Sequence, residues 1–383
     1  MDAAGLPHGL GRFYDNLGHG EILTGRWESG LPVAPYQSRE QRAHGATFRA
    51  TRVLWTSCSA GPLDRPSFST SFRDGDALFG TADVECCCSG TFYEGFPEIL
   101  SLCEYPHLEA AFEGMIKPLH HLDQEQVPMQ PLQVLLFVSG FNNCVFTSLR
   151  TLAQLCSFSS FPVHILPVVF SWPCGSLPSY FNTKRIAEGT ELQQAFFSFM
   201  KTLRARVGSA VIDVIAHSQG CRAMLKILSN PECQELGIRH TILANPEADL
   251  QAFVEVGVQV RANVKSVTVY TNPQDRALWF SQLLNTLASN TPCKLKTSLG
   301  RYTDSLQDKE GEELDMNVID TSSLHSNVNE LRHSFFHISR EMIEDFYDLI
   351  VHNLMANKRP RLAKRANQSV YDFCCAPANL TKI

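Results

Sequence analysis

The sequence VIDVIAHSQG, at residues 211–220, is the strongest indication of the fold, and it runs directly into CRAMLKIL, at residues 221–228. The first part is a short apolar run rich in β-branched residues, which is typical of a strand buried on both faces of a parallel sheet. In the second part, apolar residues recur at helical spacing. Ser218 therefore lies where a buried strand turns sharply into a helix, which is the geometry of a nucleophile elbow. A helix N-cap serine is the alternative interpretation.

Small residues flank Ser218 where a tight turn needs them. Ala216 lies two residues before the serine and Gly220 two residues after it. A larger side chain at either position would clash across the turn. The G-x-S-x-G signature usually has glycine at both positions, so Ala216 is a mild departure. The predicted strand before the serine and the helix after it, more than the short motif, favour a nucleophilic role.

Composition limits the class of protein. The 383 residues could form one large α/β domain or two smaller ones, with a large core in either case. There are 33 basic and 39 acidic residues, a net charge of −6, and nothing in this balance indicates a nucleic-acid partner. The basic run KRPRLAKR, from Lys358 to Arg365, has no interleaved aromatic residues. We expect it to be a solvated helix end or tail.

The cysteines do not indicate a metal site. The chain has 13 of them, and none shows the paired spacing of a zinc site. We expect most to be reduced, small core residues, and we expect no metal or other cofactor. No signal peptide and no apolar run long enough to span a membrane are visible. The default expectation is a cytoplasmic protein.

The chain divides into three predicted parts, which are an irregular N-terminal arm at residues 1–46, an α/β domain at 47–355 and a basic, cysteine-containing tail at 356–383. In the domain, TFRATRVLWTS and DALFGTADVECC predict a small N-terminal β extension. A helix that begins near Leu108 should kink or end at Pro118. A polar insertion is predicted near residues 285–314.

The remainder of the domain alternates between strand and helix. The predicted strands are PLQVLLFVSG, HILPVVFSW, VIDVIAHS, HTILANP, SVTVYTN and, as the last, MNVIDTSS. The predicted helices include TSLRTLAQLCSF, ELQQAFFSFMKTLRARV and a terminal SREMIEDFYDLIVHNLMANK. This alternation predicts an α/β fold, a mostly parallel sheet with helices on both faces.

A serine nucleophile needs a base to accept its proton and an acid to orient that base. We favour Asp275 in TVYTNPQDRAL as the acid, because it follows a predicted strand and so lies at the same edge of the sheet as Ser218. Glu247 and Asp249, after the preceding strand, are the alternatives. A turn-forming aspartate after Pro273 is the structural interpretation.

For the base we favour His333 in ELRHSFFH, between the last predicted strand and the terminal helix. His325 and His337 are its rivals, and position alone does not separate them, because a lone histidine is more often structural than catalytic.

Acyl transfer also needs hydrogen-bond donors for an oxygen anion. The backbone N–H of Gln219, at the start of the helix after Ser218, is one candidate. Phe141 or Asn142, after the LLFVSG strand, is the natural source of the second. Gly140 would let the backbone approach the substrate closely, although a plain glycine turn is also possible.

Several motifs, taken together and in order, resemble a largely bacterial and largely uncharacterised family of α/β hydrolases. They are RVLWTS, RDGDALFGTADV, FVSGFNN, VVFSWP, VIDVIAHSQG, ILANPEAD, VTVYTNPQDRAL and RHSFF. The resemblance runs from about Thr51 to about Phe336. It implies an α/β-hydrolase fold in which Ser218 is the nucleophile, Asp275 the acid and His333 the base.

The chain departs from this family at three places. Ser139 stands where the family usually has histidine before the glycine of the oxyanion turn. Cys221 takes a position often held by a polar residue. The acidic pair usual after the FSWP segment is missing from YFNTKRIAEG. We expect changes in packing and substrate contacts at these places, with the chemistry unaffected.

The leading hypothesis is a serine hydrolase that cleaves a carboxylic ester or thioester of a small-molecule or acylated substrate through an acyl-enzyme. Acyl transfer to an acceptor other than water uses the same residues and is the first alternative. The second is a binding or effector module that has kept the fold and lost the activity.

Overall fold

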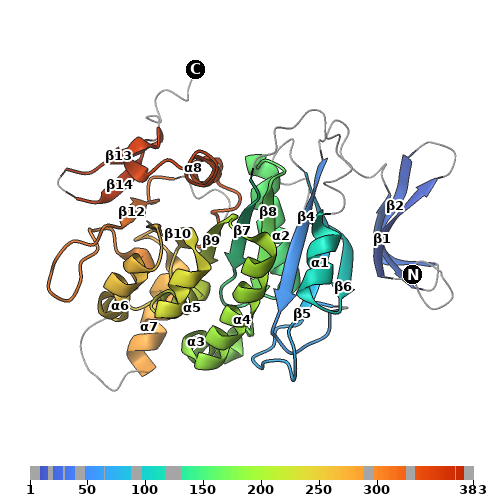
Figure 1. Ribbon diagram of the computed structural model, residues 1–383, viewed down its shortest axis with the longest axis horizontal. Helices are drawn as coiled ribbons and strands as arrows, with labels where there is room; N and C mark the ends of the chain where they lie inside the picture. The colour runs from blue at the N-terminus through green and yellow to red at the C-terminus, as the bar shows by residue number, and fades with distance from the viewer. Residues whose placement is uncertain are drawn as a thin grey trace.

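The computed structural model describes residues 9–15, 20–28, 31–38, 48–63, 65–87, 97–116, 131–288, 297–324, 333–366 and 368–374. The strands of its main sheet are β4 (Phe48–Ser57), β5 (Leu78–Cys87), β6 (Glu98–Tyr105), β7 (Gln133–Val138), β8 (Ile165–Ser171), β9 (Val211–His217), β10 (Ile238–Ala244), β11 (Ser266–Thr271), β12 (Asn317–Asp320), β13 (Leu362–Lys364) and β14 (Val370–Phe373). Their order across the sheet is β13-β14-β12-β11-β10-β9-β7-β8-β4-β5-β6 (Figure 1).

Pairing in this sheet is mostly parallel, as the sequence predicts. Every neighbouring pair from β4 through β8, β7, β9, β10, β11 and β12 to β14 is parallel. The antiparallel strands β5, β6 and β13 lie at the two edges. Every residue of β7, β8 and β11 is buried, which explains the nearly continuous apolar sequences of β7 and β8.

The helices of the structure are α1 (Leu108–Ile116), α2 (Val145–Ser159), α3 (Tyr180–Glu188), α4 (Thr190–Val207), α5 (Gln219–Leu228), α6 (Leu250–Ala262), α7 (Arg276–Ala288) and α8 (Arg340–Ile350). Buried side chains of α1, α4, α5 and α6 share one core cluster, and those of α2 and α8 share the other. Helices therefore cover both faces of the sheet (Figure 1). Of these, α3, α6 and α7 are absent from the sequence prediction.

The N-terminal part differs from the expected irregular arm. Residues 9–38 contain β1 (Gly9–Asp15), β2 (Gly20–Glu28) and β3 (Leu31–Ser38), which form an antiparallel sheet of their own. Strand pairing depends on contacts between segments, so Gly and Pro content alone does not exclude it. The expected β extension is present as β4 and β5, and an unpredicted β6 pairs with β5. Helix α1 ends at Ile116, whereas Pro118 lies outside the described residues.

The polar insertion expected near residues 285–314 is only partly a surface segment. Helix α7 continues to Ala288, and residues 289–296 lie outside the described residues. Beyond them, Leu299 and Leu306 are buried in the core. The backbone N–H of Asn272 donates to the carbonyl oxygen of Gly300, at 2.8 Å, which ties this segment to the end of β11.

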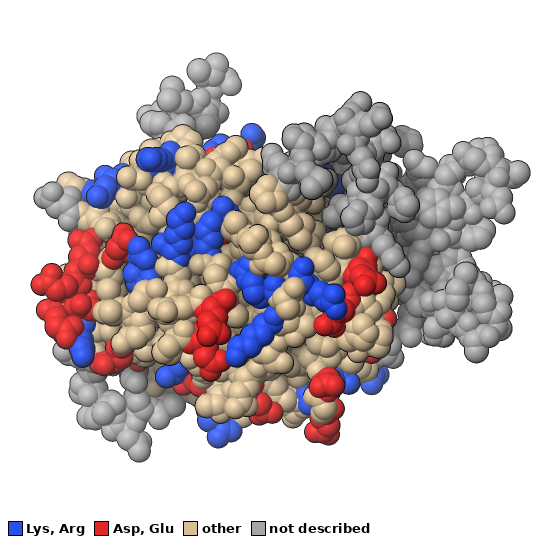
Figure 2. All heavy atoms as spheres, in the orientation of Figure 1, with Lys and Arg blue, Asp and Glu red and all other residues tan. Residues whose placement is uncertain are grey.

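Three features of the described residues concern the surface charge, the cysteines and the length of the apolar helices. Over the face seen in Figure 2, basic and acidic side chains are interspersed. Nine of the cysteines at the described positions are free thiols with a described side chain, and seven of these nine are buried. In the described residues, no helix combines the length and apolar character needed to cross a bilayer.

The C-terminal segment is not the solvated tail that the sequence predicts. Strand β14 pairs with β12, so MNVIDTSS does not supply the last strand, and β13 then pairs with β14. Helix α8 ends at Ile350, earlier than expected. The basic run contains a buried residue, because the Arg359 side chain is fully buried against Asp345, at 2.6 Å.

Arg359, Asp345 and Tyr270 form a buried polar cluster that ties the C-terminal segment to the sheet. The Arg359 guanidinium donates to the Asp345 carboxylate and to the Tyr270 hydroxyl, and that hydroxyl donates to the same carboxylate. Burial raises the pKa of Asp345, and the charge of Arg359 opposes this rise. Both charged side chains are fully buried, so each needs the other to offset the loss of its hydration.

Removing one partner should therefore destabilise the fold more than removing both. We expect Arg359→Met to lower the free energy of unfolding by about 3–5 kcal/mol, because Asp345 would remain buried without its cation. The double variant Arg359→Met/Asp345→Leu should recover at least half of that loss. Urea unfolding followed by circular dichroism measures these two variants and the single variant Asp345→Leu. A double variant whose loss equals the sum of the two single losses would contradict this interpretation.

Candidate active site

Ser218 lies between β9 and α5 in a conformation that few residues adopt. Its φ is 54° and its ψ is −122°, a positive φ at a residue other than glycine. Its N–H donates to the carbonyl oxygen of Ala244, at 3.1 Å, and its own carbonyl oxygen accepts from the N–H of Glu247, also at 3.1 Å. The end of β10 and the segment that follows it thus hold both the N–H and the carbonyl oxygen of Ser218.

Two glycines make room for this turn. A Cβ at Gly220 would lie 2.5 Å from the carbonyl oxygen of Ser139, and a Cβ at Gly140 would lie 2.6 Å from the Cβ of Ser218. Real Cβ atoms essentially never come so close to another heavy atom, so neither position accepts a side chain. Ala216, by contrast, is fully buried and tolerates its methyl group. The loop after β7 is therefore pressed directly against the turn that carries Ser218.

The structure brings His333 to Ser218 from 115 positions further along the chain. The Nε2 atom of His333 lies 2.9 Å from the Oγ atom of Ser218. Of its rivals, His325 lies outside the described residues. His337 is half-buried, its Nδ1 atom is itself buried and has no hydrogen-bond partner in the described structure, and desolvation lowers its pKa to about 4. Of the histidines that the structure describes, His333 is the one hydrogen-bonded to Ser218.

Asp275 lies on the other side of the His333 ring. Its Oδ2 atom is 2.7 Å from Nδ1 of His333, and its side chain is fully buried. The backbone N–H of Leu278 donates to Oδ1, and the Asn245 side chain donates to Oδ2, each at 2.9 Å. A carboxylate only accepts hydrogen bonds, so the His333 proton sits on Nδ1 and leaves Nε2 to accept from the serine hydroxyl.

The two alternative acids have other partners. Glu247 pairs with the buried Arg222, at 3.1 Å, and accepts a hydrogen bond from the Tyr180 hydroxyl, at 2.9 Å. Asp249 caps the N-terminus of α6 by accepting from the N–H of Gln251, at 3.0 Å. Neither is hydrogen-bonded to His333 in the described structure. Asp275 is therefore the acid that the geometry favours.

His217 is a second imidazole at this site, and the sequence analysis missed it. Its ring centroid lies 4.8 Å from that of His333, and its Nε2 atom lies 3.2 Å from the carbonyl oxygen of His333. Burial, followed by the charge of His333, lowers the pKa of His217 well below its usual value, so it stays neutral. A carbonyl oxygen only accepts, so Nε2 of His217 carries the proton. His217 therefore anchors the backbone of His333.

The signals for the missed residues are present in the sequence but are weak. His217 occupies the variable position immediately before the serine of the elbow motif, where almost any residue is compatible with the pattern. Asn245 is the asparagine of ILANP, directly after β10, where its side chain reaches Asp275. For each residue the sequence signal is a polar side chain at the carboxyl end of a parallel strand, β9 for His217 and β10 for Asn245.

The loop after β7 is fixed by hydrogen bonds that leave one backbone donor open. The N–H of Asn142 donates to the carbonyl oxygen of Cys174, at 3.2 Å, so Asn142 is committed elsewhere. The Asn143 side chain donates to the carbonyl oxygens of Gly140 and Phe141. The N–H groups of Phe141 and Gln219 donate to no residue in the described part of the chain. Of the two candidates in this loop, Phe141 is the one with a free donor.

Two of the departures from the family pattern, Ser139 and Cys221, contribute to packing and hydrogen bonding around the turn. The carbonyl oxygen of Ser139 accepts from the Trp172 ring nitrogen, at 2.8 Å, and its hydroxyl lies 3.7 Å from the thiol of Cys174. The Cys221 thiol is buried and donates to the carbonyl oxygen of Ala216, at 3.2 Å. Burial raises the pKa of Cys221 well above its usual value, so this thiol is a packing residue and not a second nucleophile.

The arrangement can activate a hydroxyl nucleophile. An oriented imidazole accepts the hydroxyl proton, a buried carboxylate stabilises the imidazolium that results, and two open N–H groups are available for an oxygen anion. Within the described parts of the chain, no cluster of three or more His, Cys, Asp or Glu side chains could hold a metal ion.

Comparisons with known proteins identify the family. A family model described as "Alpha/beta hydrolase of unknown function (DUF900)" matches residues 120–351. No curated protein matches the chain. Similar solved structures include a gene product of Listeria innocua, with 11% sequence identity over 64% of this chain and 99% of that chain and a TM-score of 0.35. Another is a 2,6-dihydroxy-pseudo-oxynicotine hydrolase, with 14% identity over 59% of this chain and 63% of that chain and a TM-score of 0.31. The family model spans more than half of the sequence, and this chain therefore belongs to that family of α/β hydrolases.

Proposed function

We propose that this α/β hydrolase is a serine hydrolase that cleaves a carboxylic ester or thioester through an acyl-enzyme. The observation that carries the proposal is the continuous hydrogen-bonded chain from Ser218 Oγ to His333 Nε2, at 2.9 Å, and from His333 Nδ1 to Asp275 Oδ2, at 2.7 Å. Three side chains from distant segments meet at hydrogen-bonding distance in the order that such chemistry requires.

In the first half of the proposed reaction, Ser218 Oγ attacks the substrate carbonyl carbon while its proton passes to Nε2 of His333. The N–H groups of Gln219 and Phe141 stabilise the oxygen anion of the tetrahedral intermediate. The imidazolium then gives its proton to the departing alcohol or thiol, which leaves an acyl group on Ser218. In the second half, His333 removes a proton from water, the hydroxide attacks the acyl carbon, and Ser218 regains its proton.

Acyl transfer to an alcohol or amine would use the same first half. Only the acceptor that reaches the acyl-enzyme would differ, so product analysis with candidate acceptors separates transfer from hydrolysis. A module without activity would also retain this fold, and the labelling experiment below separates that alternative from both enzymes.

The first prediction concerns covalent labelling by a fluorophosphonate. Wild type should be labelled, because the probe reacts with a serine that an adjacent base activates. Ser218→Ala should lose the label, and Ser229→Ala, which changes another serine at the end of α5, should keep it. Gel fluorescence and intact mass measure the labelling. An unlabelled wild type, or labelling of Ser218→Ala equal to that of wild type, would contradict the proposal.

The second prediction concerns the acid. Asp275→Asn should reduce kcat on p-nitrophenyl butyrate by about 10³- to 10⁴-fold, because the amide would no longer hold the His333 ring with its proton on Nδ1. The value of KM should change little. Asp249→Asn, which changes a helix cap without contact to the site, is the matched control and should retain activity. A kcat unchanged in Asp275→Asn would exclude the proposed role.

The third prediction treats His217 as a positioning residue. His217→Phe should lower kcat about tenfold, because the backbone of His333 loses one hydrogen bond. His217→Gln places an amide N–H near the former Nε2 atom and should restore most of the activity. Steady-state kinetics of both variants, with melting temperatures as a check of folding, test this role. A glutamine variant no better than the phenylalanine variant would contradict it.

A further inference from the structure

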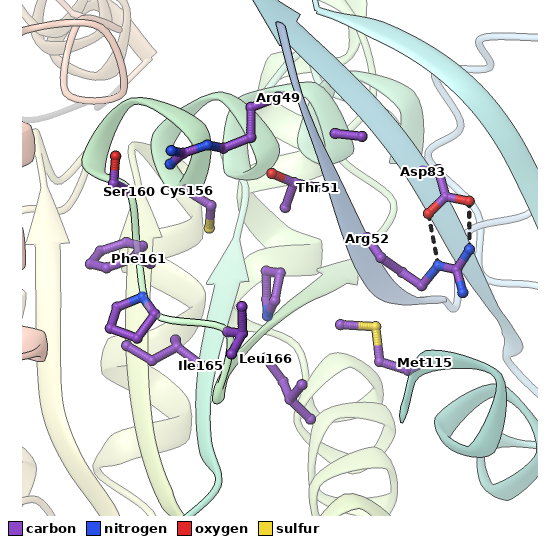
Figure 3. A pocket seen from close by; sticks show the side chains of 14 residues that line it. Arg49, Thr51, Arg52, Asp83, Met115, Cys156, Ser160, Phe161, Ile165 and Leu166 are labelled. Atoms are coloured by element: carbon purple, nitrogen blue, oxygen red, sulfur yellow. Dashed lines mark hydrogen bonds and ion pairs between the residues drawn. The ribbon is translucent and has the colours of Figure 1, made fainter. Parts of the chain in front are cut away.

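A cavity lies at the amino-terminal end of the parallel strands, whereas Ser218 lies at their carboxyl-terminal end. It has a volume of about 630 Å³, and Ile165, Leu166 and Pro167 at the amino end of β8 form one side of it (Figure 3). Ser218 follows the carboxyl end of β9, which runs in the same direction as β8. The cavity is thus separate from the proposed catalytic site, and its volume is in the range of pockets for small organic ligands.

Two prolines explain why the sheet opens at this point. Strands β4 and β8 pair from Leu54 with Val168 onward. The ladder does not extend further back, because Pro167 has no N–H to donate and the N–H of Ile165 donates to the carbonyl oxygen of Pro162, at 3.0 Å. The chain before β8 therefore turns away from β4. Residues 49–52 of β4 face the wedge that this turn leaves.

The walls of the cavity are largely apolar. Figure 3 shows the side chains that line it, drawn from β4, from the end of α1 and from the segment that joins α2 to β8. The apolar members that matter here are Met115, Phe161, Pro162, Val163, Leu166 and Pro167. Val163 is 56% exposed, so this apolar surface reaches the opening and is accessible from solvent.

Arg49 contributes a positive charge to the cavity, and none of the described residues that line the cavity neutralises it. Arg52 is neutralised by Asp83, with Nε 2.7 Å from Oδ1 and Nη2 2.8 Å from Oδ2. Among the described residues that line the cavity, Asp83 is the only acidic one. Arg49 reaches the end of α2, where its Nη1 donates to the carbonyl oxygen of Ser157, at 3.2 Å (Figure 3). Its other N–H groups donate to no residue in the described part of the chain.

We propose that this cavity binds a small amphiphilic monocarboxylate. The carboxylate pairs with the Arg49 guanidinium, whose planar donors match two carboxylate oxygens, and the apolar body lies against the walls. A cationic ligand would meet a net positive charge. A phosphate monoester would bring about two charges to one available guanidinium, so one of its charges would lack a partner. This site does not depend on the proposed catalytic function.

Calorimetric titration of the full chain with decanoate tests the proposal. Decanoate should bind, whereas acetate, which lacks the tail, and 1-decanol, which lacks the charge, should each bind at least about tenfold more weakly. Arg49→Gln should weaken decanoate binding about tenfold or more, because it removes the charge. Val163→Glu, at an exposed position, should do the same by adding a repelling carboxylate to the opening.

Arg185→Gln is the matched control, because Arg185 is an exposed arginine on α3 outside the cavity, and its decanoate affinity should equal that of wild type. Circular dichroism confirms that each variant is folded. Affinities of Arg49→Gln and Val163→Glu equal to wild type would overturn the proposal.

A crystal of the protein with 10-bromodecanoate locates the ligand directly. An anomalous bromine peak beside Phe161 or Leu166 would support the site. A peak found only beside Ser218 would overturn it, because the ligand would then be bound as a product at the proposed catalytic site. These tests of the cavity are independent of the test of the proposed function, since labelling of Ser218 can succeed or fail whether or not decanoate binds in the cavity.

Discussion

The close contact between the loop after β7 and the turn at Ser218 is the constraint on which the proposed site depends. The Ser218 backbone is in a rarely populated conformation, which costs about 1–3 kcal/mol and persists only where the surrounding structure holds it. Here the end of β10 and the segment that follows it hold both the N–H and the carbonyl oxygen of Ser218. Gly140 and Gly220 have no space for a side chain. The same contact sets where the open N–H groups of Phe141 and Gln219 lie, so nucleophile and donors are positioned by one piece of packing.

Much of the proposed site could be predicted from the sequence, because parallel strands deliver their following loops to one edge. Ser218 follows β9 and Asp275 follows β11, and β10 lies between them. The strand pattern favoured Asp275 as the acid and left Glu247 and Asp249 as alternatives. The choice of His333 over its rivals needed a family resemblance, because its segment is long and its approach to Ser218 is a tertiary contact. His217 and Asn245 were missed for the same reason, since each acts through a neighbour that is distant in sequence.

The fold was predictable where segments are long and periodic, and less so elsewhere. Strands β7 and β8 are nearly continuous apolar runs, and strands β9 to β11 are rich in β-branched residues. All five match the prediction, as do α2 and α4. Strands β13 and β14 have three and four residues beside a basic run, so local pattern favoured a tail. The deciding fact is the burial of Arg359, and nothing near it in sequence shows that Asp345 will meet it. Charge in a short segment indicates exposure on average, and a paired buried arginine is the exception.

The position of β14 has a consequence for biosynthesis. Strand β12 pairs with β11 on one side and with β14 on the other, so a ribosome must release residues beyond Phe373 before that strand is covered on both sides. Until then a nascent chain carries an open parallel edge and an Asp345 without its counter-ion. An exposed edge of this kind can pair with another chain. The interval between the synthesis of β12 and that of β14 is therefore the one in which this edge of the sheet most needs protection by a chaperone.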